Sequence, residues 1–194
     1  LRINMFTFPQ GSPETVVFFE IISSKFTPKK ADIISISAIR VSEELGVIDS
    51  FHSLLRPKNF LSPDMEDITE LDNETLSKAP SAYSTLKDLV IYLKDDLIIN
   101  SDPEFTFKVL LNQLQKNKLT QPAAKTLHLF AATQKVHGKS KFDQLIENVG
   151  DNEKVCPQTS LRKVYKSLDL YLSLLNDSFW VDENIYSLLE WHYD

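Results

Sequence analysis

The side chains that most often carry enzyme chemistry are sparse and scattered in this sequence. Cys156 is the only cysteine, which excludes an intrachain disulfide and a thiolate zinc cluster. Gly138-Lys139-Ser140 matches the end of a phosphate-binding P-loop, but Thr133 stands where the first glycine of that loop belongs. The histidines are widely separated and form no H-E-x-x-H motif (His52, His128, His137 and His192). These observations exclude the commonest nucleotide-binding and zinc-hydrolase motifs.

Length, composition and charge favour a single folded domain. The chain has 194 residues, of which 42% are hydrophobic, and its formal net charge is −6. This charge argues against bulk attraction to nucleic acid or to anionic lipid. No apolar run approaches the ~20 residues that a membrane-spanning helix needs. We therefore expect a protein without a membrane partner, in the cytoplasm or another reducing compartment.

Hydrophobic patterning predicts a three-strand antiparallel meander followed mainly by helices. Residues 15–22, 32–41 and 47–56 are rich in β-branched and aromatic residues, and only short turns separate them. A further buried strand is predicted at 97–99. Helices are predicted at 81–93, 103–115, 123–132, 140–148, 160–175 and 182–192. This order of elements predicts an α/β domain with a mixed sheet.

The segment after the third predicted strand carries the most specific sequence pattern. Residues 61–69 read L-S-P-D-M-E-D-I-T, and residues 71–81 read L-D-N-E-T-L-S-K-A-P-S. This pattern resembles the I-S-P-E-I-E-x-L-T-G-I-T-N-E-M-L-x-x-A-P-S block of the DnaQ-like (DEDD) 3′→5′ exonucleases, a family that includes the proofreading subunit of the bacterial replicative polymerase. The resemblance covers residues 15–176 and implies an RNase H-like mixed sheet flanked by helices. Residues 1–14 would then be an N-terminal leader, and residues 177–194 a C-terminal helical extension.

The resemblance also implies a catalytic site, and this sequence departs from it. Enzymes of the family hydrolyse phosphodiesters with two divalent metals held by four carboxylates. Glu20 aligns with the first of these acids, whereas Ile22 and Thr106 align with the second and third. Gln158 and Lys163 align with the general base and the fourth acid. The alignment therefore predicts a domain that has lost metal-dependent hydrolysis, with no metal cofactor, and that is retained as a binding or scaffold module.

An alternative stays open, in which nearby acids replace the missing ligands. Asp102 and Glu104 lie next to the second block and could join Glu20 in holding Mg²⁺ or Mn²⁺, which would leave residual exonuclease activity on single-stranded DNA or RNA. Lys163 could instead replace the charge of a metal, or extend into solvent. Glu70 stands at the family's glycine, where its bulk and charge would repel a phosphate chain.

A lysine-rich stretch and the C-terminal end are the candidate contact surfaces. Residues 105–142 contain no acidic residue, while the rest of the chain holds 14 basic and 27 acidic residues. Such asymmetry favours a nucleic acid or an acidic protein as a partner, although a solvated lysine-rich face explains it equally well. The predicted helix at 182–192 could pack on its own domain, bind another protein or form a homodimer. The lysines of the stretch are Lys108, Lys116, Lys118, Lys125, Lys135, Lys139 and Lys141.

Overall fold

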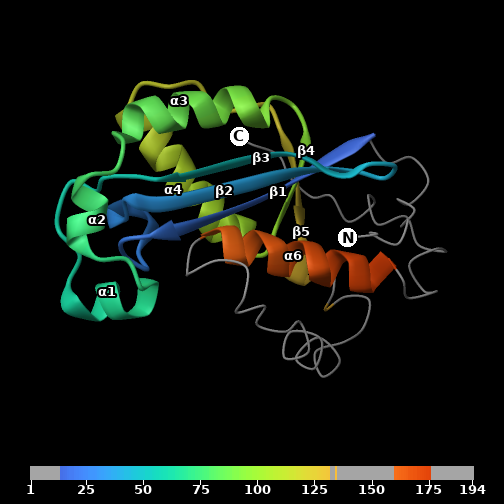
Figure 1. The fold of residues 1–194 in the computed structure, drawn as a ribbon. Coiled ribbons are helices and arrows are strands. Elements are labelled where there is room, and N and C mark those ends of the chain that lie inside the picture. Colours follow the sequence, from blue (N-terminus) through green and yellow to red (C-terminus); the bar gives the residue numbers. More distant parts are fainter. Residues whose placement is uncertain (1–13, 132–133, 135–159, 176–194) are drawn as a thin grey trace.

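The computed structural model describes residues 14–131, 134 and 160–175 (Figure 1). The elements in this part of the chain are, in order, β1 (Thr15–Ser23), the 3-10 helix η1 (Pro28–Lys30), β2 (Ile33–Ser42), β3 (Gly46–Leu54), α1 (Pro63–Thr69), α2 (Asn73–Ser77), α3 (Ala82–Leu93), β4 (Leu97–Asn100), α4 (Pro103–Lys116), β5 (Lys125–His128) and α6 (Ser160–Leu175). Every helix among these residues is too short or too polar to cross a lipid bilayer.

The strands form one mixed sheet in the order β3-β2-β1-β4-β5. β1 pairs antiparallel with β2, and β2 pairs antiparallel with β3, which confirms the predicted meander. β4 then pairs parallel with β1, and β5 pairs parallel with β4. Helix α4 connects these last two parallel strands, as a crossover must. β1 therefore lies at the centre of the sheet, with neighbours of both kinds.

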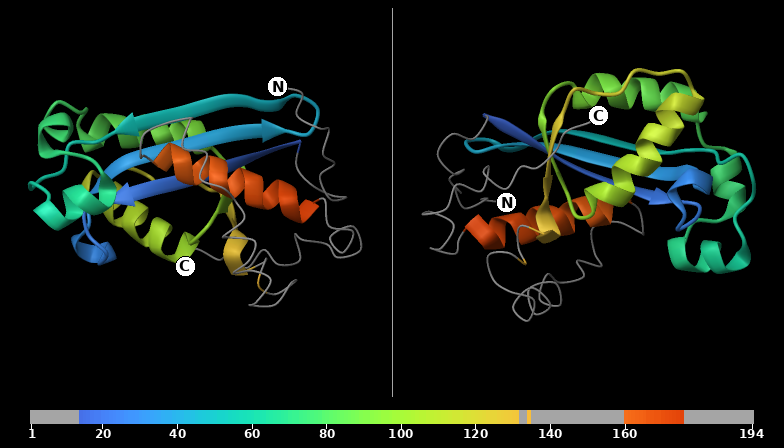
Figure 2. Two further views of the ribbon diagram at one scale, coloured as in Figure 1. Left: turned by 60° about the horizontal axis from the view of Figure 1, so that its bottom comes forward. Right: turned by 180° about the vertical axis from the view of Figure 1, so that it is seen from behind.

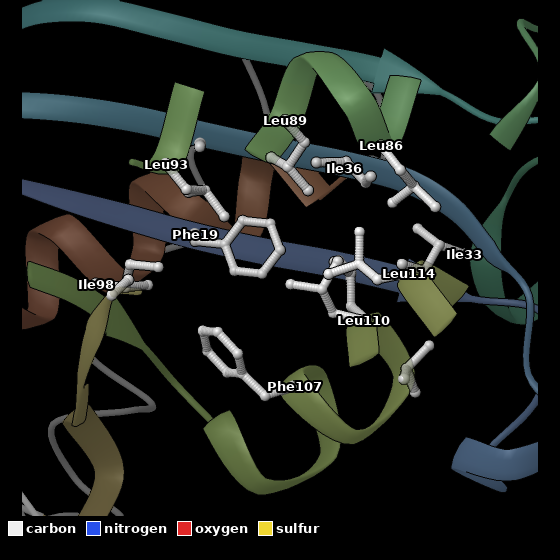
Figure 3. Packing of buried hydrophobic residues seen from close by; sticks show 14 of the residues in the cluster. Phe19, Ile33, Ile36, Leu86, Leu89, Leu93, Ile98, Phe107, Leu110 and Leu114 are labelled. Atoms are coloured by element: carbon white, nitrogen blue, oxygen red, sulfur yellow. The ribbon is translucent and has the colours of Figure 1, made fainter. Parts of the chain in front are cut away.

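Helices cover both faces of the sheet, so β1 is buried on both sides. Val17 and Phe19 point to the face covered by α3 and α4, where Phe19 packs among the leucines of these helices (Figure 3). Val16 and Phe18 point to the opposite face, where Phe18 meets Tyr171 of α6 edge to face, with ring centroids 5.4 Å apart. Figure 2 shows α6 lying along this second face. Burial on both faces explains why the strand is a continuous apolar run interrupted only by Glu20.

Hydroxyl groups as well as apolar side chains hold α6 against the sheet. The Oγ of Ser160, the first residue of α6, lies 2.8 Å from the Oγ atoms of both Ser35 and Ser37 on β2. All three serines are fully buried. Because a buried hydroxyl without a partner is costly, these contacts fix the position of the start of α6 over β2.

The helix predicted at residues 123–132 is wrong, because residues 125–128 form strand β5. Residues 129–131 and residue 134 are helical. The alanines and leucines there suit a helix locally, but pairing with the edge of β4 buries Thr126 and Leu127 and overrides this weak preference. The helices predicted at 140–148 and 182–192, and residues 1–13 of the expected leader, lie outside the described residues.

Candidate functional site

A hollow of about 430 Å³ opens at the carboxyl ends of the parallel strands β1 and β4. In open α/β sheets this edge is the usual place of a ligand site, because loops and helix starts converge there. The last residues of β1, helix α1, the start of α4 and one residue of α6 line it. These residues are Glu20, Ile21, Ile22, Ser23, Phe26, Met65, Ile68, Thr69, Ser101, Asp102, Phe105, Thr106 and Lys163.

Glu20 is the buried acid of this hollow, with only 2% of its surface exposed. Its Oε1 atom accepts one hydrogen bond from the backbone N of Ser101, at 2.9 Å, and another from the Oγ of Ser167, also at 2.9 Å. Asn100 holds the first of these donors in place, because its side-chain amide donates to the carbonyl of Phe19. The carboxylate is therefore held by donors from the β4–α4 turn and from α6.

Burial raises the pKa of Glu20 above its ordinary value of 4.5, because a charged carboxylate is poorly solvated there. The hydrogen bonds from Ser101 and Ser167 act in the opposite direction, and so does the positive charge of Lys163. Burial is the largest of these influences. The donors and the lysine therefore offset only part of the effect of burial, and the charged form of Glu20 is less favoured than that of an exposed glutamate.

Three other positions that align with the family's catalytic acids and were singled out in the sequence line the same hollow. Ile22 follows Glu20 by two residues and so points to the same face of β1. Thr106 lies in the first turns of α4 and is 4% exposed. Lys163 is an exposed residue of α6. The fold brings an apolar group, a hydroxyl and a cation together around Glu20, and Gln158 lies outside the described residues.

The acids proposed as replacements are not gathered around Glu20. Asp102 lines the hollow, but its Oδ1 accepts a hydrogen bond from the backbone N of Phe105 and caps α4. Glu104 does not line the hollow and instead lies 3.7 Å from the Nζ of Lys108. In the described ranges, no three histidine, cysteine, aspartate or glutamate side chains gather as a metal-binding group. Among the described residues, only Glu20 and Asp102 are acids that line the hollow, and two divalent cations need several oxygen ligands each.

The wall of the hollow away from Glu20 is apolar. Phe26 is 72% exposed and Ile68 is 61% exposed, and both line the hollow together with Met65 and Phe105. Glu70, at the family's glycine, ends α1 with φ 53° and ψ 29°. A residue with a Cβ atom is strained in this left-handed conformation, which glycine adopts without strain. Glu70 itself does not line the hollow.

The four described lysines of the basic stretch do not form one patch around this site. Lys108 lies in the second turn of α4 and is paired with Glu104. Lys116 and Lys118 are at the other end of α4, and Lys125 begins β5, so these three exposed lysines lie toward the amino ends of β4 and β5. The hollow lies at the opposite, carboxyl ends. Lys135, Lys139 and Lys141 lie outside the described residues.

Sequence reasoning missed the two donors that hold Glu20. A signal for Ser167 was available, since it follows Lys163 by four residues and therefore lies on the same face of α6. Ser101, next to Asp102, was not singled out in the sequence. It acts on Glu20 through its backbone N–H, which every residue except proline carries, and through its side chain, which also lowers the pKa of Glu20.

Comparison with known protein families gives a match over most of the chain. The model of the family described as Exonuclease (RNase_T) matches residues 19–169. This range includes Glu20 and every other residue that lines the hollow.

Curated relatives include PolC-type DNA polymerase III from two bacteria. The Thermotoga maritima protein is 23% identical over 163 residues, which are 77% of this chain and 12% of that protein. The Bacillus subtilis protein is 24% identical over 120 residues, which are 60% of this chain and 8% of that protein. The chain thus spans about an eighth or less of the length of these relatives.

Solved exonuclease structures share the fold. The nuclease domain of 3′hExo, a DEDDh family member bound to rAMP, superposes with a TM-score of 0.72 at 15% identity, covering 88% of this chain and 96% of that domain. An Escherichia coli exonuclease I complex with single-stranded DNA gives a TM-score of 0.70 at 12% identity, covering 87% of this chain and 42% of that one. These similarities confirm the RNase H-like fold that the sequence pattern implied.

Proposed function

Because the chain belongs to the RNase_T exonuclease family, we propose that it is a degenerate 3′→5′ exonuclease domain that binds nucleic acid ends without metal-dependent hydrolysis. The observation that carries this proposal is the state of Glu20. Its carboxylate is 2% exposed and already accepts two hydrogen bonds from Ser101 and Ser167.

Two-metal hydrolysis needs carboxylates that are free to coordinate cations and that together balance their charge. Around Glu20 the chain places Ile22, Thr106 and Lys163 instead. An apolar side chain offers no ligand, and a lysine cation repels divalent ions. The donor set that the described residues offer therefore does not fit a two-metal centre.

The proposal includes binding of a nucleic acid because the hollow beside Glu20 is present in the structure. Its apolar wall of Phe26, Ile68, Met65 and Phe105 suits a base or sugar, and Lys163 supplies a positive charge for a phosphate. The structural neighbours named above were solved with rAMP and with single-stranded DNA, which supports a nucleic acid 3′ end as the ligand. If no nucleic acid binds, the alternative partner is an acidic protein that contacts the lysine-rich stretch.

The test is a nuclease assay combined with a binding assay on the same protein. DNA and RNA single strands labelled at the end away from the 3′ terminus are incubated with Mg²⁺ or Mn²⁺, and binding is followed by fluorescence anisotropy in EDTA. We expect no shortening of the strand, together with binding that does not need a divalent ion. Lys163→Ala should weaken that binding, whereas Lys87→Ala, an exposed lysine of α3, should not.

Metal-dependent shortening of the strand that Glu20→Ala abolishes would overturn the proposal. It would establish the alternative, in which Glu20, Asp102 and Glu104 support residual exonuclease activity. The Glu20→Ala protein must be shown to be folded by circular dichroism, because removing a buried, hydrogen-bonded side chain is itself destabilising. Glu104→Ala, on the exposed surface, then distinguishes the acids of this set.

A further inference from the structure

A second hollow, of about 370 Å³, lies beside the loop that connects β3 to α1. No carboxylate lines it. Two cations, one exposed aromatic ring and the two ends of α2 form its walls. The residues that supply these walls are Arg56, Lys58, Phe60, Asn73, Leu76 and Ser77.

The two cations of this hollow are not used within the described part of the protein. The side chains of Arg56 and Lys58 are both exposed, and neither forms an ion pair with a described residue. One acid, Asp32, contacts this loop. Its carboxylate accepts hydrogen bonds from the backbone N of Lys58 and from the side-chain amide of Gln113. A guanidinium and an ammonium group are thus free to bind an anion.

Phe60 is the most exposed large hydrophobic residue of the described chain, at 80%. An exposed phenyl ring at the edge of a hollow offers a flat surface on which a planar ring can stack. A cation next to an aromatic surface suits a ligand that carries both a negative charge and an aromatic ring. A simple metal ion or an apolar peptide lacks this combination.

The loop that carries these side chains is fixed at several points. The backbone N of Arg56 donates to the carbonyl of Pro80, at 3.0 Å, and that of Lys58 donates to Asp32, at 3.1 Å. The Asn73 side chain accepts from the backbone N of Leu61, at 2.7 Å, and donates to its carbonyl, at 3.1 Å. Because Leu61 follows Phe60 directly, these contacts fix the backbone from which the Phe60 side chain extends. A preorganised loop loses less conformational entropy when a ligand binds.

We propose that Arg56, Lys58 and Phe60 form a second binding site, for a nucleotide unit. The phosphate binds to the guanidinium and ammonium groups, and the base stacks on the phenyl ring. The same chemistry occurs in a free nucleoside monophosphate and in one residue of a single strand. This site is separate from the Glu20 hollow, since the two share no lining residue.

The test measures binding of adenosine 5′-monophosphate, adenosine and inorganic phosphate to the full chain by isothermal titration calorimetry. We expect the monophosphate to bind at least about tenfold more tightly than phosphate or adenosine alone, since only it uses both parts of the site. Phe60→Ala should weaken the monophosphate about tenfold and leave phosphate unchanged. Arg56→Ala should weaken both.

Matched surface variants complete the experiment. Tyr83→Ala removes an aromatic ring that is 53% exposed on α3, and Lys87→Ala removes an exposed lysine of the same helix. Both should bind the monophosphate as the original protein does. A short oligodeoxythymidylate that binds more tightly than the monophosphate, and weakens with Phe60→Ala, identifies a strand as the source of the ligand, whereas equal affinity identifies the free nucleotide.

The proposal is overturned if Arg56→Ala and Phe60→Ala bind the monophosphate as tightly as the original protein, or if inorganic phosphate binds as well as the monophosphate. Lys163→Ala separates this result from the fate of the proposed function, because Lys163 lines only the Glu20 hollow. Binding that depends on Lys163 and not on Arg56 or Phe60 would overturn the second site and leave the proposed function in place.

Discussion

The Oγ of Ser167 donates a hydrogen bond of 2.9 Å to Oε1 of Glu20, and this bond joins α6 to β1 across 147 residues of sequence. It takes up one acceptor position of the carboxylate that the sequence pattern aligns with the first catalytic acid of the family. A hydroxyl from the protein thus satisfies an oxygen that an active two-metal site would offer to a cation.

The pH dependence of stability is expected to change when Glu20 is replaced by glutamine. The folded protein holds a proton on Glu20 at pH values where the unfolded chain has lost it, because burial raises the pKa above 4.5. The stabilising effect of this proton is therefore complete below pH 4.5 and is lost as the pH rises through the folded pKa. Glu20→Gln does not titrate, so its stability relative to the original protein should increase over this range. Urea unfolding of both proteins from about pH 4 to pH 8 measures the difference, and a constant difference would contradict the prediction.

Replacement of Ser167 by alanine should destabilise the fold by about 1–3 kcal/mol at neutral pH, since it removes a donor from a buried acid. The same substitution in a Glu20→Gln background should cost less, because the neutral amide oxygen depends less on the hydroxyl. A double-mutant cycle by urea unfolding gives the coupling between the two side chains. If the two substitutions change the free energy of unfolding additively, the hydrogen bond between Ser167 and Glu20 contributes nothing measurable to stability.

Glu70→Gly should stabilise the protein by about 0.5–1 kcal/mol. Glu70 has a left-handed backbone conformation, with φ 53°, that glycine adopts without strain. Asp67→Gly is the matched control, since Asp67 is exposed within the same helix. Glycine there should destabilise by a similar amount. Thermal unfolding of both variants tests the pair, and two changes of the same sign would show that the conformation at position 70 is not the cause.

Restoring the missing acids should restore metal binding if the hollow has kept the shape of the family's site. Ile22→Glu, Thr106→Asp and Lys163→Asp together add three carboxylates around Glu20. We expect Mn²⁺ to raise the melting temperature of this variant and not that of the original protein, with about 2.7 kcal/mol of stabilisation when Mn²⁺ is at 100 times its dissociation constant. Adding Glu20→Ala to the variant should reduce the effect. An equal Mn²⁺ response in the original protein would contradict the loss of the metal centre.

Sequence patterning was sufficient for the elements whose local preference agrees with their tertiary environment. The strands of the meander and helices α3, α4 and α6 carry strong periodic or β-branched signals, and the structure confirms them. β5 carries no such signal, since its strand conformation comes from pairing with β4. The short helices α1 and α2 were quoted as a motif but not predicted as elements, because five to seven residues show too little periodicity.

The candidate site was predictable in its positions and not in its contacts. Alignment with the family pattern placed Glu20, Ile22, Thr106 and Lys163 around one hollow, and they do line it. The pattern cannot show where a side chain points, so it grouped Glu104 with Glu20 although Glu104 pairs with Lys108. The roles of these residues in binding stay predictions.

The contacts of Glu20 also bear on how the chain folds during synthesis. Its hydrogen-bond donors are 81 and 147 residues further along the sequence. A ribosome releases β1 long before α6, so Glu20 lacks its α6 donor while most of the sheet is being made. Closing contacts of such separation is slow. A nascent chain that has not yet released α6 would therefore leave this face of the sheet open, which makes the interval before α6 emerges the stage at which the protein is most exposed to aggregation or to a chaperone.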